Sequence, residues 1–500
     1  MTEITSQLST AIADGYKFER HLGEGGMATV YLTHDLKHDR NVALEVSNPE
    51  VDNNHIGEPF MLLQSFTVGL MLVALIGALP AEADAQLVLS EQLKARIAAV
   101  EPQVITWRRD IHQHPELGNR EFRTAKLVAD HLRALGLEVE TEVAHTGVVG
   151  VLRGARPGPV VLLRADMDGL PVTERVDVPF ASTVTTEYND AQVGVMHACG
   201  HDTHVAILMG VAQVMAGIRD ELPGTVKFVF QPAEEGPPQG EEGGAELMVE
   251  QGILTNPDVD AAFALHIWSK GEVHNIFYTP RGAFASADDF RILVRGRQTH
   301  GGYPWNGVDP IVISAQIINA LQTIVSREMK LIDNAAVVTI GKIQGGVRSN
   351  IIPEQVEMVG TIRALDPEDR KKIHESVRRI ATGIAESMGA TADVQIPLTT
   401  SYPVTYNDPD LTAEMLPVLQ AVAGADRVHL TPAETGAEDF SFIAEQVPGF
   451  YIQLGGRPTD VAEEDAADHH TPDFFIDDSG LGLGVHVMTA MALHYLRTHQ

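Results

Sequence analysis

The sequence contains a single cysteine, Cys199, among 500 residues. One thiol cannot close an intrachain disulfide, which excludes a disulfide scaffold and a zinc site made of several cysteines. Positive charge is also scarce, since 36 Lys and Arg stand against 68 Asp and Glu and give a formal net charge of -32. A phosphate-binding surface would have to form against this mean charge, so we expect neither nucleic acid nor an anionic membrane as a partner.

The remaining composition is that of a globular protein. Hydrophobic residues make up 44% and charged residues 21% of the chain, and its length favours two or more domains. The 21 histidines are enough for clusters in which imidazole and carboxylate side chains from separate loops bind a metal.

The first residues differ in character from the rest. The stretch from Gly23 to Tyr31, followed by Val42 to Val46, resembles the glycine-rich loop and third strand of a bacterial Ser/Thr protein kinase. Glu45 stands where that family has its phosphate-pairing lysine, and no catalytic HRD or metal-binding DFG motif follows. We therefore interpret residues 1–55 as a truncated kinase-like fragment without kinase activity.

A long uncharged run follows from Phe60 to Leu79, and Ala83-Asp84-Ala85 precedes Gln86. This pattern predicts a signal peptide over residues 60–85 and an exported protein, periplasmic or secreted. The run lacks the basic segment that normally precedes it, so an uncleaved membrane anchor, or a buried helix in a cytoplasmic protein, stays open.

After Gln86, short apolar runs alternate with segments of helical periodicity, which predicts an α/β fold. Three runs lead into polar residues, Arg164-Ala165-Asp166, Gln231-Pro232-Ala233-Glu234 and Leu265-His266. Open α/β sheets place ligands beyond the carboxyl ends of their strands, so we expect these residues at one shared site. A second, α+β unit is expected from Ala283 onward, with strands over 289–294, 336–343 and 355–361 and helices over 310–327 and 369–388.

Residues with metal-binding chemistry gather in the segment 197–204, where Cys199 and His201 lie two positions apart before a helical pattern. A helix start would help to hold the sulfur as thiolate, although a structural cysteine explains this motif equally well. Glu234 and Glu235 are adjacent carboxylates that repel unless a metal neutralises one and the other holds a proton. His266 follows an apolar run, and His470 precedes Thr471-Pro472.

Together these motifs resemble the M20 metallopeptidases, above all the amidohydrolase branch of hippurate hydrolases, N-acyl-amino-acid deacylases and auxin-conjugate hydrolases. The resemblance covers residues 95–500 and includes WRRDIHQHPELG, RADMDGLP, CGHDTH, FQPAEEG, ALHIW and HHTPDF. It implies two divalent metal ions, Zn²⁺, Mn²⁺ or Co²⁺, bridged by Cys199 and bound by His201, Glu235, His266 and His470. It further implies Glu234 as the general base and Asp168 as the residue that orients a ligand. Asp166 stands where the wider family has a metal-binding histidine, and it either ligates in that place or leaves the site weaker.

The resemblance extends to the second unit. It implies a two-domain M20-like fold, with a catalytic domain over 95–282 and 396–500 and an inserted lid domain over 283–395 that also mediates a homodimer or higher oligomer. His300 matches the histidine that polarises the substrate carbonyl and steadies the oxyanion. Asn350 matches a substrate-contacting asparagine, although a turn-forming role explains this residue nearly as well. For Glu438-Asp439-Phe440, another family motif, we favour a structural role.

The implied function is metal-dependent hydrolysis of the amide bond of an N-acyl amino acid or a similar small amide. Metal-activated water would attack the amide and Glu234 would take its proton. A metallocarboxypeptidase acting on short peptides would use the same site. The alternative from a different class is a non-catalytic binding protein on a dead hydrolase scaffold.

Overall fold

The computed structural model describes residues 16–24, 28–35, 40–47, 90–332, 334–399 and 401–500. The predicted signal segment, residues 60–85, lies outside the described residues. Near the N-terminus, β1 (Tyr16–Glu24), β2 (Ala28–Asp35) and β3 (Arg40–Ser47) form an antiparallel sheet in the order β1-β2-β3. This sheet belongs to one compact unit, residues 1–78, and all elements described below belong to a second, residues 79–500.

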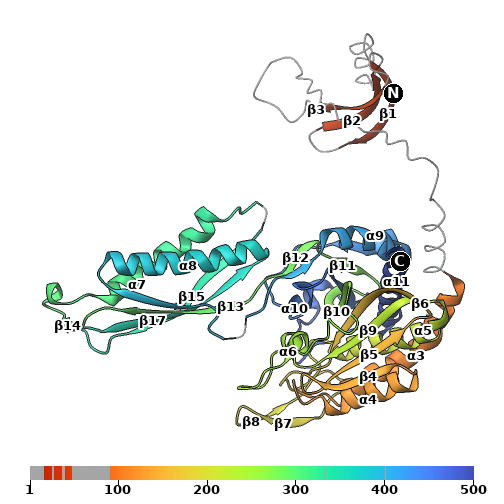
Figure 1. The fold of residues 1–500 in the computed structure, drawn as a ribbon, viewed down its shortest axis with the longest axis horizontal. Helices are drawn as coiled ribbons and strands as arrows, with labels where there is room; N and C mark the ends of the chain where they lie inside the picture. Colours follow the sequence, from red (N-terminus) through yellow and green to blue (C-terminus); the bar gives the residue numbers. More distant parts are fainter. Residues whose placement is uncertain (1–15, 25–27, 36–39, 48–89, 333, 400) are drawn as a thin grey trace. The chain divides into compact units, whose positions relative to one another are not determined.

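This second compact unit, residues 79–500, is organised around an eight-stranded mixed sheet (Figure 1). Its strands lie in the order β20 (Val428–Leu430), β11 (Ile276–Tyr278), β21 (Gly449–Arg457), β10 (Ala261–Glu272), β6 (Arg156–Asp166), β9 (Pro223–Gln231), β5 (Gly147–Arg153) and β4 (Glu138–Val143). The four central strands, β21, β10, β6 and β9, are parallel. Because both faces of such strands are covered, they are rich in apolar residues, as in the runs 160–163 of β6 and 228–230 of β9, and β9 is buried throughout.

Helices cover both faces of this sheet. On one face α3 (Glu91–Gln113), α5 (His201–Ala216) and α11 (Leu481–Thr498) pack on each other, and α4 (Phe122–Ala134) and α9 (Pro409–Ala423) add to this layer. On the other face α6 (Gly244–Glu250) and α10 (Ser441–Ala444) enclose a smaller core. Successive residues of β6 enter different cores, Val161 and Leu163 the larger and Val160 and Leu162 the smaller. The predicted α/β fold is thereby confirmed.

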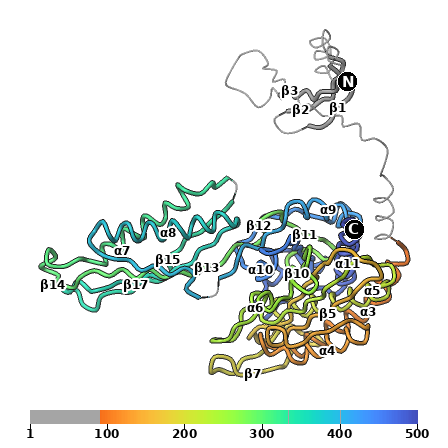
Figure 2. The backbone as a smooth tube through the Cα atoms, in the orientation of Figure 1, coloured from red at the N-terminus to blue at the C-terminus, as the bar shows by residue number. Residues whose placement is uncertain are grey.

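An inserted unit, residues 288–395, has a core of its own. Its antiparallel sheet has the order β15 (Ala336–Gly345), β17 (Gln355–Ala364), β13 (Asp288–Arg295) and β18 (Thr391–Gln395), and it is covered by α7 (Pro310–Thr323) and α8 (Pro367–Ser387). Both helices begin at an Asp-Pro pair whose aspartate accepts backbone N–H groups. Figure 2 shows that this unit is one continuous stretch of chain, whereas the large sheet combines segments before and after it. Residues 79–500 thus have a two-domain architecture.

Two predicted boundaries are wrong. The α-helix expected to reach Arg327 ends at Thr323. The chain stays helical beyond this residue, but as a π-helical segment, Ile324–Glu328. The strand expected to end at Leu265 continues to Glu272, because β10 keeps pairing with β21 beyond His266.

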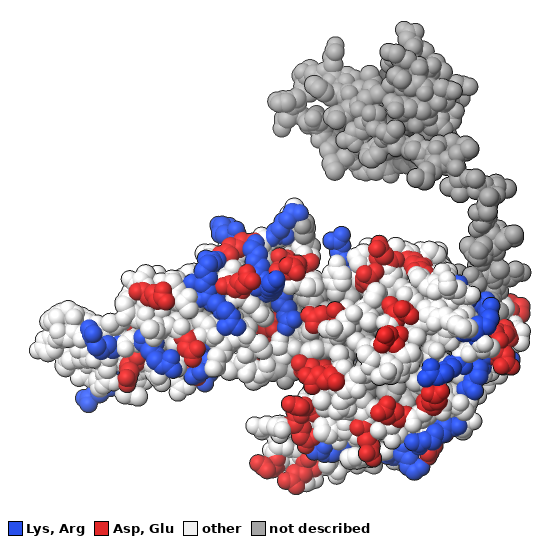
Figure 3. Space-filling model, in the orientation of Figure 1, with Lys and Arg blue, Asp and Glu red and all other residues white. Residues whose placement is uncertain are grey.

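Surface charge is dispersed over the second unit. On the face that Figure 3 shows, Asp and Glu occur over both the large sheet and the inserted unit, interspersed with Lys and Arg. Among the described helices, none has the length and apolar character to cross a bilayer.

Candidate metal centre

The chain brings five segments to the carboxyl end of the central strands. Asp168 follows β6, Glu234 and Glu235 follow β9, and Cys199 precedes α5. His470 lies on the loop after β21. The fifth segment is β10 itself, because His266 lies within this strand and not beyond its end, so that a strand fixes its backbone on both sides.

The turn between Cys199 and His201 depends on glycine. Gly200 has a left-handed backbone with φ of 92°, and a Cβ there would lie 2.2 Å from Ile267 Cγ2. The helix α5 begins at the next residue, so Cys199 and His201 flank the turn and both present their side chains to the same space. A larger residue at position 200 would push the pair away from β10.

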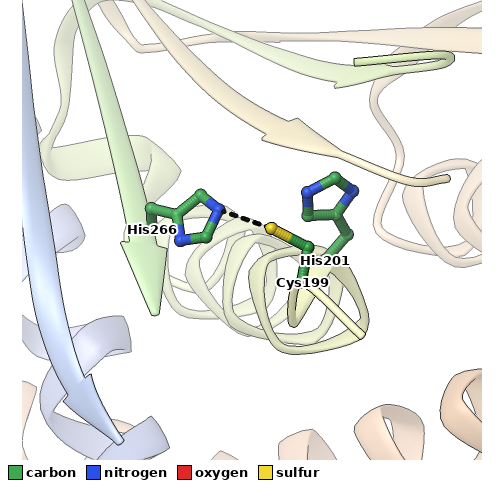
Figure 4. A group of neighbouring side chains, drawn as sticks. All are labelled: Cys199, His201 and His266. Atoms are coloured by element: carbon green, nitrogen blue, oxygen red, sulfur yellow. Dashed lines mark hydrogen bonds between the residues drawn. The ribbon is translucent and has the colours of Figure 1, made fainter. Parts of the chain in front are cut away.

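Cys199, His201 and His266 form a first group of donor atoms, all within 4.8 Å of one another. Figure 4 shows the Cys199 sulfur directed at His266 from the start of α5, and Sγ lies 3.4 Å from Nε2. His266 Nδ1 donates to the Ile267 carbonyl at 2.6 Å, which leaves Nε2 unprotonated. His201 Nδ1 lies 3.1 Å from Asp168 Oδ1, and its Nε2 is buried without a hydrogen-bond partner. The His266 ring therefore directs a free lone pair at the same space as the sulfur, and the His201 ring does so when its single proton lies on Nδ1 beside Asp168.

Cys199, Glu235 and His470 form a second group that shares the sulfur. His470 Nε2 lies 3.3 Å from Sγ and 2.8 Å from Glu235 Oε1. The side chain of His470 is about half exposed, whereas that of Glu235 is largely buried. A single sulfur common to two donor groups could be shared by two metal ions.

The charge of the site favours cations. Burial lowers the pKa of His201, but Asp166, Asp168 and Glu235 outweigh it and raise that pKa to about 10. Burial and the nearby carboxylates Glu235 and Glu234 raise the pKa of the Cys199 thiol well above its usual range. The sequence predicted that the helix start would help to hold the thiolate, whereas burial and acidic neighbours act in the opposite direction. A divalent ion held here would supply the missing positive charge, and the chemistry of a mixed sulfur, imidazole and carboxylate set suits borderline ions such as Zn²⁺, Mn²⁺ or Co²⁺.

Two nearby histidines, which the sequence motifs did not single out as ligands, have both ring nitrogens engaged. His204 Nδ1 donates to Asp166, and its Nε2 accepts the Ile267 N–H at 2.8 Å. His469 Nε2 accepts the Ser269 N–H at 3.1 Å. Asp166 also accepts a hydrogen bond from Arg164 at 2.6 Å. Asp166, His201 and His204 also form a group of donor atoms within 4.8 Å of one another, so Asp166 could hold a metal ion as well as support the neighbouring histidine.

Glu234 lies between the donor groups and a buried network of charges. Its Oε2 is 3.8 Å from His201 Nε2, and its carboxyl group lies beside Glu438 and Asp439. Burial and the charges of Glu438, Glu235 and Asp439 raise the pKa of Glu234 well above its usual range. A carboxyl group with this environment suits a proton carrier beside a metal centre.

Asp168 acts on the ligands through hydrogen bonds. One carboxylate oxygen contacts His201 Nδ1, and the other accepts the backbone N–H of Glu235 at 3.0 Å. A single side chain thus orients a ligand from each donor group, which makes Asp168 a positioning residue.

His300 and Asn350 lie together in the inserted unit. His300 is on β14 (Thr299–His300), paired with β16 (Ile351–Ile352), and the Gly301 N–H donates to the Asn350 carbonyl at 2.8 Å. His300 Nδ1 accepts the Gly302 N–H at 2.9 Å, so a neutral ring carries its proton on Nε2 and is a hydrogen-bond donor there. The hydrogen bonds and ring contacts of His300 are with residues of its own unit.

Comparison with known proteins gives a consistent answer. Residues 162–494 match the model of peptidase family M20/M25/M40. The chain is 41% identical to thermostable carboxypeptidase 2 of Saccharolobus solfataricus, over 81% of this chain and 99% of the relative. It is 36% identical to N-acetylcysteine deacetylase of Bacillus subtilis, over 80% of this chain and 98% of the relative.

A solved structure extends the comparison to the fold. The dinuclear metal binding peptidase YXEP of Bacillus subtilis, from the M20 family, matches with a TM-score of 0.64 and 34% identity, covering 80% of this chain and 99% of that one. Relatives at this identity and coverage are hydrolases acting on amide or peptide bonds. The chain is accordingly a hydrolytic enzyme, and it belongs to the M20/M25/M40 family of peptidases.

Proposed function

We propose that this hydrolase binds two divalent metal ions and cleaves the amide bond of N-acyl amino acids or similar small amides. The observation that carries the proposal is the shared position of Cys199 in two donor groups, with the buried carboxyl group of Glu234 beside them. When bound, the two ions supply a water molecule of lowered pKa and polarise the amide carbonyl.

The residues of the chain carry out proton transfer, hold the ligands in place and stabilise the oxyanion. Glu234 takes the proton of the attacking water and passes it to the leaving amine. Asp168 holds His201 and the Glu235 backbone in place. His300 donates from Nε2 to the developing oxyanion, and Asn350 on the neighbouring strand contacts the substrate. We further propose that the inserted unit brings these two residues to the site and mediates a homodimer or higher oligomer.

A second candidate function is carboxypeptidase activity on short peptides. It is favoured by the relative named thermostable carboxypeptidase 2, which is more similar to this chain than the deacetylase, 41% against 36% identity. Both reactions use the same water, base and metal ions, so the pocket around the acyl group decides between them.

The relative rates at which N-acyl amino acids and dipeptides are hydrolysed distinguish the two functions. The purified enzyme would be loaded with Zn²⁺, Mn²⁺ or Co²⁺ in turn and given matched panels of N-acetyl amino acids, N-benzoyl amino acids and dipeptides. Release of the amine from N-acyl amino acids, with larger kcat/KM than for any dipeptide, supports the proposal. A preference for dipeptides supports the carboxypeptidase function, and no product from any substrate contradicts both.

Metal removal is expected to abolish turnover. The base and the oxyanion donor cannot lower the pKa of water by themselves, so exhaustive chelation should leave no measurable hydrolysis. Addition of Zn²⁺, Mn²⁺ or Co²⁺ should restore activity, while Ca²⁺ or Mg²⁺ should not, because these ions prefer all-oxygen sites. Full activity in protein shown by elemental analysis to be metal-free would contradict the mechanism.

Deletion of residues 1–85 is expected to leave hydrolysis largely intact. Every donor atom of the two groups, and Glu234, comes from residues 199–470. The measurement compares kcat/KM of the full chain with that of a chain starting at Gln86. Loss of activity in a shortened protein that is folded and metal-loaded would assign a role to the kinase-like segment.

We also propose that residues 60–85 direct export. N-terminal sequencing of protein recovered from the expressing cells and from the medium tests this, and a mature chain beginning at Gln86 is the expected result. A chain that keeps residues 60–85 would contradict cleavage.

A further inference from the structure

His469 precedes the ligand His470 on the same loop, but its ring is held differently. Its Nε2 accepts the backbone N–H of Ser269 at 3.1 Å. A nitrogen that accepts a hydrogen bond carries no proton, so the neutral ring bears its proton on Nδ1. The strand β10 therefore fixes the tautomer of His469.

The protonated nitrogen faces Cys199. Nδ1 lies 3.2 Å from the Cys199 carbonyl oxygen and 3.6 Å from Sγ. Since sulfur is larger than oxygen, 3.6 Å is within hydrogen-bonding reach, and one N–H is shared by the two acceptors. The rings of His266 and Phe474 lie on either side, with centroids 5.4 Å and 4.9 Å from that of His469.

We propose that His469 is a positioning residue for the bridging thiolate of Cys199. Its Nδ1–H stabilises the negative charge on the sulfur and holds the cysteine so that the lone pairs of Sγ face both donor groups. Hydrogen bonds to an ionised acceptor are the stronger kind, and partners that orient metal ligands contribute to metal affinity.

Anchoring of the loop does not account for this arrangement. The Ser269 hydroxyl donates to the Ala467 carbonyl at 2.8 Å, which ties the loop to β10 independently of the His469 ring. Loop anchoring leaves the contact from Nδ1 to Cys199 unexplained. This inference rests on the dinuclear centre of the proposed function and not on its substrate.

Two variants test the two hydrogen bonds of the His469 ring separately. In His469→Asn the amide nitrogen takes the place of Nδ1, so the donor to Cys199 is kept and the acceptor for Ser269 is lost. In His469→Gln the amide oxygen reaches the place of Nε2, so the acceptor for Ser269 is kept and the donor is lost. Each variant of the full chain would be loaded with Co²⁺, and its thiolate-to-cobalt absorption band and Co²⁺ affinity would be measured against a competing chelator.

The proposal expects the two variants to differ. His469→Gln should shift the absorption band to lower energy, because the sulfur lone pairs lose their hydrogen bond, and should weaken Co²⁺ binding by about 10- to 100-fold. His469→Asn should keep the band and the affinity close to those of the unmodified protein. Neither readout needs a substrate, so the result stands apart from the outcome of the substrate panels.

Three outcomes would overturn the proposal. A native-like His469→Gln with an altered His469→Asn would show that the ring acts only through Ser269. Equal shifts in both variants would mean that the donor is not the part that matters. Loss of all Co²⁺ binding by both folded variants would make His469 a ligand and not a positioning residue.

Discussion

Glu234→Gln is expected to lower kcat by about 10²- to 10⁴-fold, the usual contribution of a general acid–base group. The amide keeps the shape of the side chain but cannot accept a proton from water. Metal content and KM should stay near normal, because in the proposed mechanism Glu234 belongs to neither ligand group. Steady-state kinetics and elemental analysis of the same preparation provide the measurement.

Glu235→Gln is the matched control, since it makes the same chemical change one residue along the chain. Glu235 Oε1 lies 2.8 Å from His470 Nε2 in the second donor group, so this variant should lose metal as well as activity. The reverse pattern, with metal lost from Glu234→Gln and kept by Glu235→Gln, would exchange the two roles. Unchanged turnover in both variants would place the active site elsewhere.

Although Glu234 and Glu235 are adjacent in the chain, their carboxyl groups have different surroundings. Glu234 points toward Glu438 and Asp439 behind the site, and burial with these charges raises its pKa. The backbone of Glu235 is held by Asp168, and its side chain meets His470. The sequence predicted different roles for the pair from electrostatic repulsion alone, and the structure supplies a distinct environment for each.

The fold was predictable where burial leaves a continuous pattern along the chain. The central strands β6 and β9 are apolar runs because helices cover both faces of the sheet. The end of β10 was not predictable from the pattern, because His266 interrupts the run while the pairing with β21 continues to Trp268 and, after an irregularity, resumes at Glu272. A polar functional side chain inside a strand can therefore be mistaken for the end of that strand when only the sequence is known.

The donor residues could be proposed from local motifs, but their tautomers could not. His204 and His469 lie among the ligands, and a backbone N–H donates to Nε2 of each ring. By contrast, Nε2 of His201 has no hydrogen-bond partner and Nε2 of His266 faces the Cys199 sulfur. The relevant N–H groups belong to Ile267 and Ser269 on β10, which are 63 and 200 residues away along the chain. Only the tertiary structure brings them together.

Arg164→Met is expected to lower the free energy of unfolding by about 3–5 kcal/mol, the usual cost of removing one partner from a buried ion pair. The Arg164 side chain is 1% exposed and contacts Asp166 at 2.6 Å, Asp439 at 2.7 Å and Glu438 at 2.9 Å. Methionine fills much of the volume but leaves these carboxylates buried without their common cation. Chemical denaturation of the metal-free protein measures the effect without a contribution from bound ions.

Arg123→Met is the matched control for this prediction. Arg123 makes two hydrogen bonds to Asp110, at 2.7 Å and 2.8 Å, but its side chain is 40% exposed. Solvent replaces a lost partner at such a position, so this variant should change stability little. Equal effects of the two substitutions would contradict the role of Arg164 as the cation that holds the acidic network together. A large effect of Arg164→Met alone, with weakened metal binding, would show that this network also keeps Glu234 and Asp166 in place beside the ligands.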